Sequence, residues 1–458
     1  MQDSTFSEHR YPATGYAWYV VILLTCAYIL SYLDRWVLSL LVELIKADLG
    51  LTDTQLGLLL GPAFAFFYAV MGIPLGWMAD RYSRRTMIGI GITLWCAATA
   101  AAGLARSFVH LAVTRVLVGV GEATLSPCAL SLITDYFAPG KRGRAIAFYT
   151  GAVSIGSGIA YLLGGQIIQW AAERPELSWP LVGEVKPWQA VFLLVGLPGL
   201  LIAALMFTVR EPRRTGTAVT KEMTSTQVGF PTALRYLTRR MKSFGGIFGC
   251  MSVITVLAYS HAWLPAYFSR TWGWDIPQFS VYNGLGLLIV GPLSVNFGGW
   301  LADWLRNRGH PDGSVIVLIA GVFIMVPMSI IFPLMPSAES SFAVYLLTIV
   351  GAAMSTAAAP SAIVTIAPGQ IRSQTIALFY LTISLIGAGI GPPAVAILTD
   401  SVFRDEQAIR YSMAVLPVVF GLLGLIPAWH LRRAFREQVA ERAAAEKAHT
   451  AGPAAAPA

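Results

Sequence analysis

The residues of this chain with the clearest chemical potential are charged side chains inside long apolar stretches. Asp34 and Arg35 are neighbours in an apolar run that begins near Trp18 and continues to about Leu41. Ionisable residues are costly in such a segment, so they are expected to face a bundle interior or a wet cavity and to mark an ion or substrate path. The pair is therefore predicted to form part of a switch.

A second charged pair, Arg115 and Glu122, lies in another apolar run. Their spacing of seven residues is close to two helical turns, so both side chains face roughly the same way. A buried carboxylate can take up and release a proton, and protonating one acid would free an arginine. Asp34 and Glu122 are predicted proton-coupling residues, and Arg35 and Arg115 predicted substrate-binding or switch residues. An inert network in which the charges only neutralise one another is the alternative.

Two further side chains are candidates for the same substrate-binding or switch role. Tyr32 lies two residues before Asp34, and His261 lies in the middle of a later apolar run beside Tyr259 and Ser260. A buried histidine can carry a proton. The competing interpretation of His261 is a core residue whose hydrogen bonds are satisfied.

Composition indicates where these residues are placed. The chain has 458 residues, of which 56% are hydrophobic and 12% charged, whereas soluble proteins carry roughly a quarter charged residues. The net charge of +8 could suggest a nucleic-acid partner. We expect none, because the basic residues gather in alternate short loops between apolar runs, which is an orientation signal in membrane proteins.

Twelve apolar runs are each long enough to cross a hydrocarbon core of about 30 Å. They are expected at residues 18–41, 55–79, 87–105, 111–134, 145–170, 188–209, 246–268, 279–302, 315–334, 342–366, 375–398 and 412–431. Lysine and arginine are about three times as frequent in the even-numbered junctions and the two termini as in the odd-numbered junctions, which predicts that both termini are cytoplasmic. The predicted fold class is an all-α integral membrane protein with twelve transmembrane helices.

The two halves of the chain repeat one another. The pentapeptide at 76–80 returns at 299–303 with one conservative change, and the Ala-Pro-Gly at 138–140 returns at 367–369. Parallel repeats with a binding site near the midplane are a recurring transporter architecture. We therefore expect two pseudo-symmetric six-helix bundles. The predicted division is a cytoplasmic N-terminal tail at 1–17, bundles at 18–209 and 243–431, a cytoplasmic linker at 210–242 and a cytoplasmic C-terminal tail at 432–458.

The loop after the second run is rich in charge and begins with a glycine that permits close helix approach. An acid at the helix end can pair with nearby arginines and hold one conformational state closed. The predicted gating latch comprises Gly76, Asp80, Arg81, Arg84, Arg85 and the repeat residue Asp303. An ordinary loop carrying only the orientation signal is the alternative.

No catalytic motif is present in the sequence. A phosphate-binding Gly-Lys-Ser/Thr loop, a His-Glu-x-x-His zinc motif and a Gly-x-Ser-x-Gly nucleophile motif are all absent. The four cysteines show no metal or redox spacing. We therefore expect no enzyme activity, no catalytic residue, no cofactor and no metal, and an energy source in a gradient.

The loop at 76–85 resembles the hallmark loop of the major facilitator superfamily, and Arg115 resembles that superfamily's fourth-span arginine motif. Four segments also look like the Spinster branch of lysolipid and sphingosine-phosphate transporters, and the short loops and Ala-rich termini suggest a bacterial member. The four segments are Tyr32–Arg35, Gly76–Arg85, Gly119–Ala123 and Gly156–Gly165. The resemblance implies the major facilitator fold and a proton-linked exporter of an amphiphile with an anionic headgroup. Asp34 and Glu122 would then be the protonation sites, and Arg35 the partner of the headgroup or part of the switch.

Three functional classes remain open on the sequence. The first is a proton-coupled secondary active transporter of a lysolipid or sphingoid phosphate, the substrate class that the resemblance implies. The second is a proton-coupled symporter of small organic anions such as sugar acids, or a multidrug efflux antiporter. The third is a membrane receptor without transport. The expected partners are the substrate, protons and membrane lipids, and the expected location is the inner (plasma) membrane, as a monomer.

Overall fold

The computed structural model describes residues 11–79, 81–174, 177–179, 183–212 and 230–450. Twelve helical segments in this part of the chain are long and apolar enough to cross a membrane. They cover Thr14–Leu40, Asp53–Ala79, Arg84–Ala102, Phe108–Tyr136, Lys141–Ala172, Pro187–Thr208, Met241–Trp272, Ile276–Asn307, Gly313–Leu334, Ala338–Ile366, Gln374–Phe403 and Glu406–Ala444. The twelve predicted spans are confirmed, and most helices continue for several residues beyond the apolar run.

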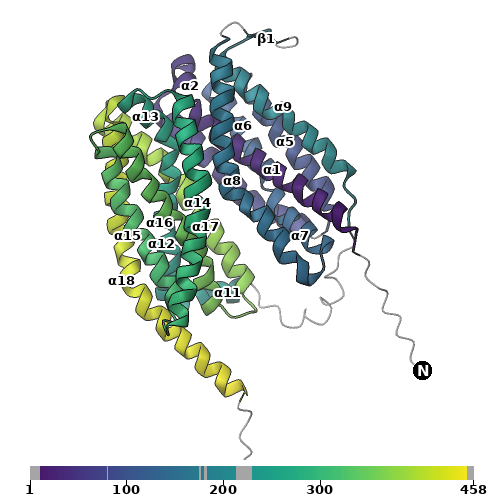
Figure 1. The fold of residues 1–458 in the computed structure, drawn as a ribbon, viewed down its shortest axis with the longest axis vertical. Coiled ribbons are helices and arrows are strands. Elements are labelled where there is room, and N and C mark those ends of the chain that lie inside the picture. The colour runs from purple at the N-terminus through teal and green to yellow at the C-terminus, as the bar shows by residue number, and fades with distance from the viewer. Residues whose placement is uncertain (1–10, 80, 175–176, 180–182, 213–229, 451–458) are drawn as a thin grey trace, which may run out of the picture. The chain divides into compact units, whose positions relative to one another are not determined.

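The helices carry the labels of Figure 1. Those before residue 213 are α1 (Thr14–Leu40), α2 (Val42–Leu49), α3 (Asp53–Leu60), α4 (Pro62–Ala79), α5 (Arg84–Ala102), α6 (Phe108–Glu122), α7 (Leu125–Tyr136), α8 (Pro139–Ala172) and α9 (Pro187–Thr208). Those after residue 229 are α11 (Phe230–Arg239), α12 (Met241–Ser260), α13 (Leu264–Trp272), α14 (Ile276–Asn307), α15 (Gly313–Ile331), α16 (Ala338–Ile366), α17 (Arg372–Ile397) and α18 (Ile409–Thr450). Short 3-10 segments lie at His261–Trp263, Phe332–Leu334 and Glu406–Ala408, and a π-helix, η4, lies at Leu398–Phe403.

The described residues group by their contacts into two compact units. Unit 1 draws on Met1–Leu38 and Phe66–Glu222, and unit 2 on Ser39–Ala65 and Met223–Ala458. The stretch 39–65 therefore packs with the later part of the chain, although the sequence repeat assigns it to the first bundle. The predicted bundle boundaries follow the repeat and remain a prediction.

Three spans are interrupted, and a proline follows each interruption in the first turn of the next helix. Pro62 begins α4, Pro127 lies in the first turn of α7, and Pro265 is the second residue of α13. Proline fits there because the first-turn N–H groups have no partner inside the helix. The interruptions leave Glu122 as the last residue of α6 and His261 directly after α12.

Glycine pairs set the contact between neighbouring spans in both units. A Cβ on Gly121 would lie 2.8 Å from the carbonyl oxygen of Gly91, and a Cβ on Gly351 would lie 2.7 Å from that of Gly321. Each glycine of the second pair follows its counterpart by the same number of residues. Small residues that let helix backbones touch are typical of membrane bundles, and here the contact between α5 and α6 is repeated between α15 and α16.

The remaining features of the described residues are a two-stranded sheet, the long C-terminal helix and the linker. Strands β1 (Leu177–Trp179) and β2 (Gly183–Val185) pair antiparallel, with Ser178 opposite Glu184. Figure 1 shows α18 as one long helix whose last turns extend beyond the neighbouring helices of unit 2. The predicted linker at 210–242 contains α11 and the start of α12, and its residues 213–229 lie outside the described part.

The glycine contacts predict that alanine substitutions destabilise the fold at some glycines and not at others. Gly121→Ala and Gly351→Ala should each destabilise the fold by about 1–3 kcal/mol, because the added methyl group meets backbone atoms that cannot rotate away. Thermal unfolding of the purified protein in detergent would measure the loss. Gly151→Ala is the matched control, since a Cβ there has no neighbour within 4 Å. Equal melting temperatures for all four proteins would contradict this account.

Candidate functional site

Glu122 is a buried hydrogen-bond acceptor in unit 1. Its Oε2 accepts hydrogen bonds from Ser31 Oγ at 2.6 Å and from Arg35 Nε at 2.7 Å, and Arg35 Nη2 lies 2.6 Å from the same oxygen. The Glu122 side chain is 0% exposed and that of Arg35 is 21% exposed. A carboxylate at the C-terminal end of a helix opposes the helix dipole, so the arginine and the serine are needed to hold it there.

Asp34 is adjacent to Arg35 in the chain but lies in different surroundings. It is fully buried, and neither carboxylate oxygen has a hydrogen-bond partner among the described residues. Thr99 lies beside the carboxylate without forming a hydrogen bond of normal geometry. Successive helix positions point about 100° apart, which explains why Arg35 reaches Glu122 while Asp34 faces the third span.

Arg115 completes the predicted group of four charges, but it forms no hydrogen bond with a carboxylate of the described residues. Its Nη1 donates to the main-chain oxygen of Asp34 at 3.1 Å, and its guanidinium lies 5.6 Å from the ring centre of Phe192. Nε and Nη2 are buried and have no hydrogen-bond partner within the described part of the chain. The site thus places an unbonded carboxylate and an incompletely bonded guanidinium in one apolar region.

Aromatic rings surround the Arg35 guanidinium. Its Cζ lies 5.3 Å from the ring centre of Tyr32 and 4.9 Å from that of Tyr68. Tyr28 packs against Tyr32 and stacks on Tyr149 with ring centres 5.0 Å apart. Rings at this distance attract a cation and keep water away from it. Tyr32 therefore lies at the predicted site, while Tyr68, Ser31 and Thr99 were not predicted.

His261 lies in unit 2 at the interruption of the seventh span. Its ring is packed edge-on against Tyr345 and Phe332, with ring centres 5.2 and 6.0 Å away. The side chain is 9% exposed, and Nε2 has no hydrogen-bond partner among the residues that the structure describes. Tyr345 in turn donates its hydroxyl hydrogen to Asn283 Oδ1 at 2.9 Å. His261 is thus a buried residue in neutral, aromatic surroundings.

The predicted latch can be described only in part, because Asp80 lies outside the described residues. Gly76 has open space around its Cα, and Arg81 packs on the Trp77 ring with its Cζ 3.5 Å from the ring centre. Asp303 is 72% exposed and lies 3.9 Å from Arg306. Exposed pairs of this kind contribute little stability.

Arg84 is the buried member of the latch segment. It pairs with Asp135, the second-to-last residue of α7, and donates from Nε to Glu211 Oε1 at 2.7 Å. Ser83 Oγ and the main-chain N–H of Arg85 both donate to Glu211 Oε2 at 3.0 Å. Arg84 therefore ties the start of the third span to the ends of the fourth and sixth spans. The sequence identified Arg84 but neither of its partners.

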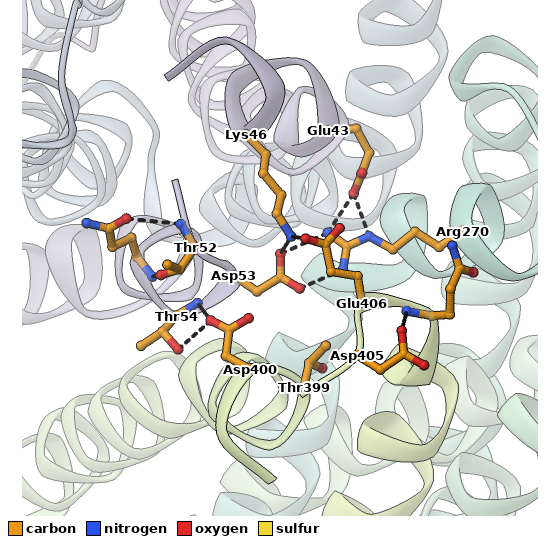
Figure 2. Close-up of polar contacts among 12 residues, drawn as sticks. Glu43, Lys46, Thr52, Asp53, Thr54, Arg270, Thr399, Asp400, Asp405 and Glu406 are labelled. Atoms are coloured by element: carbon orange, nitrogen blue, oxygen red, sulfur yellow. Dashed lines mark hydrogen bonds and ion pairs between the residues drawn. The ribbon is translucent and has the colours of Figure 1, made fainter. Parts of the chain in front are cut away.

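A further ion-pair network lies wholly within unit 2 and was not predicted (Figure 2). Its five members, named here the Asp53 network, are Glu43, Lys46, Asp53, Arg270 and Glu406. Lys46 Nζ lies 2.6 Å from Asp53 Oδ1, and Arg270 donates two N–H groups to the two oxygens of Asp53 at 2.6 and 2.9 Å. One signal for it was available, since Lys46 and Arg270 are basic residues in the junctions where basic residues are scarce.

The sequence profile of the Major Facilitator Superfamily matches residues 24–392, which is most of the chain. The chain belongs to the Major Facilitator Superfamily. It is accordingly a multi-pass membrane transporter and not an enzyme. Among the described residues of this transporter, no group of three or more His, Cys, Asp or Glu could hold a metal ion.

Individual relatives refine the comparison. An "MFS-type efflux pump" of Mycolicibacterium smegmatis is 29% identical over 432 residues, 93% of this chain and 95% of that protein. A "Probable L-galactonate transporter" of Escherichia coli is 27% identical over 325 residues, 68% of each chain. The solved structure of a bacterial homologue of the human lysosomal transporter Spinster, inward-facing and unoccupied, matches with a TM-score of 0.78 and 26% identity, covering 93% of this chain and 98% of that one. These matches confirm the predicted superfamily, its Spinster branch and the twelve-helix fold.

The contacts of Glu211 predict a dependence of stability on pH. Burial alone would raise the pKa of this carboxyl, but the N–H of Arg85 and the guanidinium of Arg84 donate to it and hold its pKa below the usual value. The unfolded chain therefore binds the proton more readily, so the stabilisation is complete above the unfolded pKa of about 4.3 and is lost as pH falls below it. Melting temperatures from neutral pH to below about pH 4 should fall less steeply for Glu211→Gln than for the wild type.

The matched control for this measurement is Asp303→Asn, which changes an acid that is 72% exposed. Its melting temperature should follow pH as the wild-type value does. A Glu211→Gln variant with the wild-type slope would show that the Arg84 contacts do not couple this acid to folding.

Proposed function

We propose that the protein is a proton-coupled secondary transporter that moves an anionic amphiphile of the lysolipid or sphingoid-phosphate type by alternating access. The observation that carries the proposal is the group of four charges within the spans of unit 1, of which Asp34, Arg115 and Glu122 are buried and Arg35 is partly buried. Asp34 has no hydrogen-bond donor among the described residues, and Glu122 is held by Arg35 and Ser31. Such charges inside membrane helices usually serve ions or substrates.

The geometry supports a sequence of proton and headgroup binding. Glu122 binds Arg35 through one oxygen, Oε2, while its Oε1 has no hydrogen-bond partner in the described part of the chain. A proton on Glu122 would cancel the charge that holds the guanidinium. Arg35, still packed against Tyr32 and Tyr68, would then be available to an anionic headgroup, because guanidinium groups bind phosphate and carboxylate well. Asp34 would be the second protonation site and Arg115 a second contact.

The scarcity of charge in the last six spans supports the proposal that the substrate has an apolar part. Their acidic and basic residues lie at or near the span ends, and Gly313–Leu334 contains none at all. His261 contributes a buried imidazole among aromatic rings there. An alkyl chain is compatible with such surroundings, because it needs no polar partner.

Orientation, assembly and gating belong to the same proposal. The excess of lysine and arginine in the even-numbered junctions and the termini supports an inner (plasma) membrane protein with both termini in the cytoplasm. We propose that it acts as a monomer and that the loop containing Gly76, Asp80, Arg81, Arg84 and Arg85 is a gating latch. Arg84 supports this role through its buried ion pairs, and the exposed Asp303 supports it only by sequence repeat.

A small organic anion is the second candidate substrate. It is favoured by the relative named for L-galactonate transport, and the relative named as an efflux pump favours a multidrug antiporter. A sugar acid offers a carboxylate to Arg35 but also hydroxyl groups that need polar partners. The amphiphile is preferred because charged side chains in the last six spans lie near the span ends.

The proton-coupling assignment predicts the behaviour of two variants. Asp34→Asn and Glu122→Gln should each lower proton-driven transport by about tenfold or more, the scale of a coupling free energy of 1–3 kcal/mol, because neither amide can carry the proton. Transport in proteoliposomes with an imposed pH gradient would measure it, and exchange without a gradient should be retained. Glu173→Gln is the control, since this acid is 60% exposed. Wild-type gradient-driven rates in both variants would refute the assignment.

The substrate class predicts the outcome of a competition panel. Lysolipids and sphingoid phosphates should stimulate counterflow in proteoliposomes, and shortening the alkyl chain at a fixed headgroup should weaken binding by about 0.8 kcal/mol for each CH₂ removed. Sugar acids and cationic drugs should have little effect. Selective counterflow by a sugar acid would instead establish the second candidate.

A further inference from the structure

We propose that the Asp53 network is a gate on the membrane face opposite the termini, and that Arg270 is the residue whose bonds break when this gate opens. The proposal rests on the alternating-access part of the proposed function and not on the substrate or the proton. It concerns a set of charges that shares no residue with the group of four in unit 1. All the contacts that carry it lie within unit 2.

Asp53 is fixed by its position at the start of a helix and by ion pairs to two cationic side chains. It is the first residue of α3, directly after the N-cap Thr52, whose hydroxyl accepts from Gln55 N–H in a capping box. A carboxylate in the first turn is favoured by the helix dipole. The Asp53 side chain is 1% exposed and that of Arg270 is 5% exposed, and Figure 2 shows the carboxylate lying between Lys46 and Arg270.

The members divide by the part of the chain that carries them. Glu43 and Lys46 are on α2, which connects the first and second spans, and Asp53 is the first residue of the second span. Arg270 lies near the end of the seventh span, and Glu406 is the first residue of the twelfth. The two sets come from the two repeats, which must separate on one face in each cycle if transport is by alternating access.

Every ion pair of Arg270 joins the two sets. Its guanidinium binds Asp53 with two N–H groups and Glu43 through Nε at 2.9 Å and Nη2 at 2.8 Å. By contrast, the Lys46–Asp53 pair lies within one set. Asp53 therefore keeps a cationic partner after Arg270 leaves, which avoids the large cost of a carboxylate left alone in a buried position.

Further contacts, besides the ion pairs, run across the same boundary. Thr54 donates its N–H and its hydroxyl to Asp400 Oδ2 in η4 at 2.6 and 2.7 Å (Figure 2). Behind them, a Cβ on Gly61 would lie 2.1 Å from the carbonyl oxygen of Ala388, so the backbones of the two sets touch. Ser39 also donates to the main-chain oxygen of Ala262. The ion pairs thus lie at the end of a close backbone contact, as a gate requires.

This division predicts opposite effects for two charge removals. All the ion pairs that Arg270→Gln removes join the two sets, so the open population on this face should rise several-fold. Lys46→Met removes the partner that Asp53 retains in the open state, while its other contact, Glu406, is 60% exposed and weak for that reason. The open population of Lys46→Met should therefore fall. An ion pair with a merely structural role would give the same sign for both.

The experiment is a distance measurement between spin labels at positions 44 and 402. Leu44 and Val402 are 40% and 62% exposed and belong to the two different sets. The labels are introduced as cysteines into a transport-competent variant lacking the four native cysteines, reconstituted in lipid without substrate or pH gradient. We expect a longer-distance population that is larger in Arg270→Gln and smaller in Lys46→Met than in the parent. Glu406→Gln, which changes only the exposed acid, should resemble the parent.

If Arg270→Gln does not fold, Arg270→Lys provides the same test, because it keeps the charge and loses the two-pronged contact; its open population should also rise. Shifts of equal sign for the position 270 and 46 variants, or one unchanged distance in all of them, would overturn the gate. Failure of the transport predictions for Asp34 and Glu122 would leave these distances as expected. The two proposals can therefore fail separately.

Discussion

Arg35 directs two N–H groups at a single oxygen of Glu122 inside an apolar bundle, and the rest of the unit 1 site is arranged around that contact. Taking both charges out of water is costly, and only close geometry with further hydrogen bonds offsets the cost. Ser31 supplies one such bond and the rings of Tyr32 and Tyr68 enclose the guanidinium. The interruption after α6 allows Glu122 to sit where these groups converge.

The Asp53 network and the four charges of unit 1 differ in how completely their hydrogen bonds are satisfied. In the Asp53 network each oxygen of Asp53 has a cationic donor. In unit 1, by contrast, Asp34 and part of Arg115 lack hydrogen bonds among the described residues. A saturated network holds a structure in place, whereas an unsaturated one retains the capacity to bind something else. This contrast underlies the assignment of gating to the first group and of binding to the second.

The sequence predicted the fold well because apolar runs of bilayer length have few alternative structures. It also marked Asp34, Arg35, Arg115 and Glu122 as candidates, since charges within such runs are conspicuous, and their functional roles stay a prediction. It did not predict their pairing, because a helical spacing gives the direction of a side chain but not the neighbour that it meets. Arg35 reaches a residue 87 positions away.

The Asp53 network escaped prediction for a related reason. Its charges lie at span ends, where acidic and basic residues are ordinary, and Arg270 is 217 positions from Asp53. Likewise, Asp135 and Glu211 gave no local sign that they would meet Arg84. The repeat of short motifs predicted that the chain has two similar parts, but it could not show that residues 39–65 pack with the later one.

The repeated glycine pairs have a consequence for how the two parts differ. Arg115 precedes Gly121 by as many residues as Tyr345 precedes Gly351, so equivalent helix positions carry a guanidinium in one part and a phenol in the other. The phenol hydrogen-bonds to Asn283 and packs against His261. The same helix packing is thus used twice, with a charged side chain in one part and a neutral one in the other. Directionality in such a molecule would arise from the asymmetry of its side chains and not from its nearly symmetric scaffold.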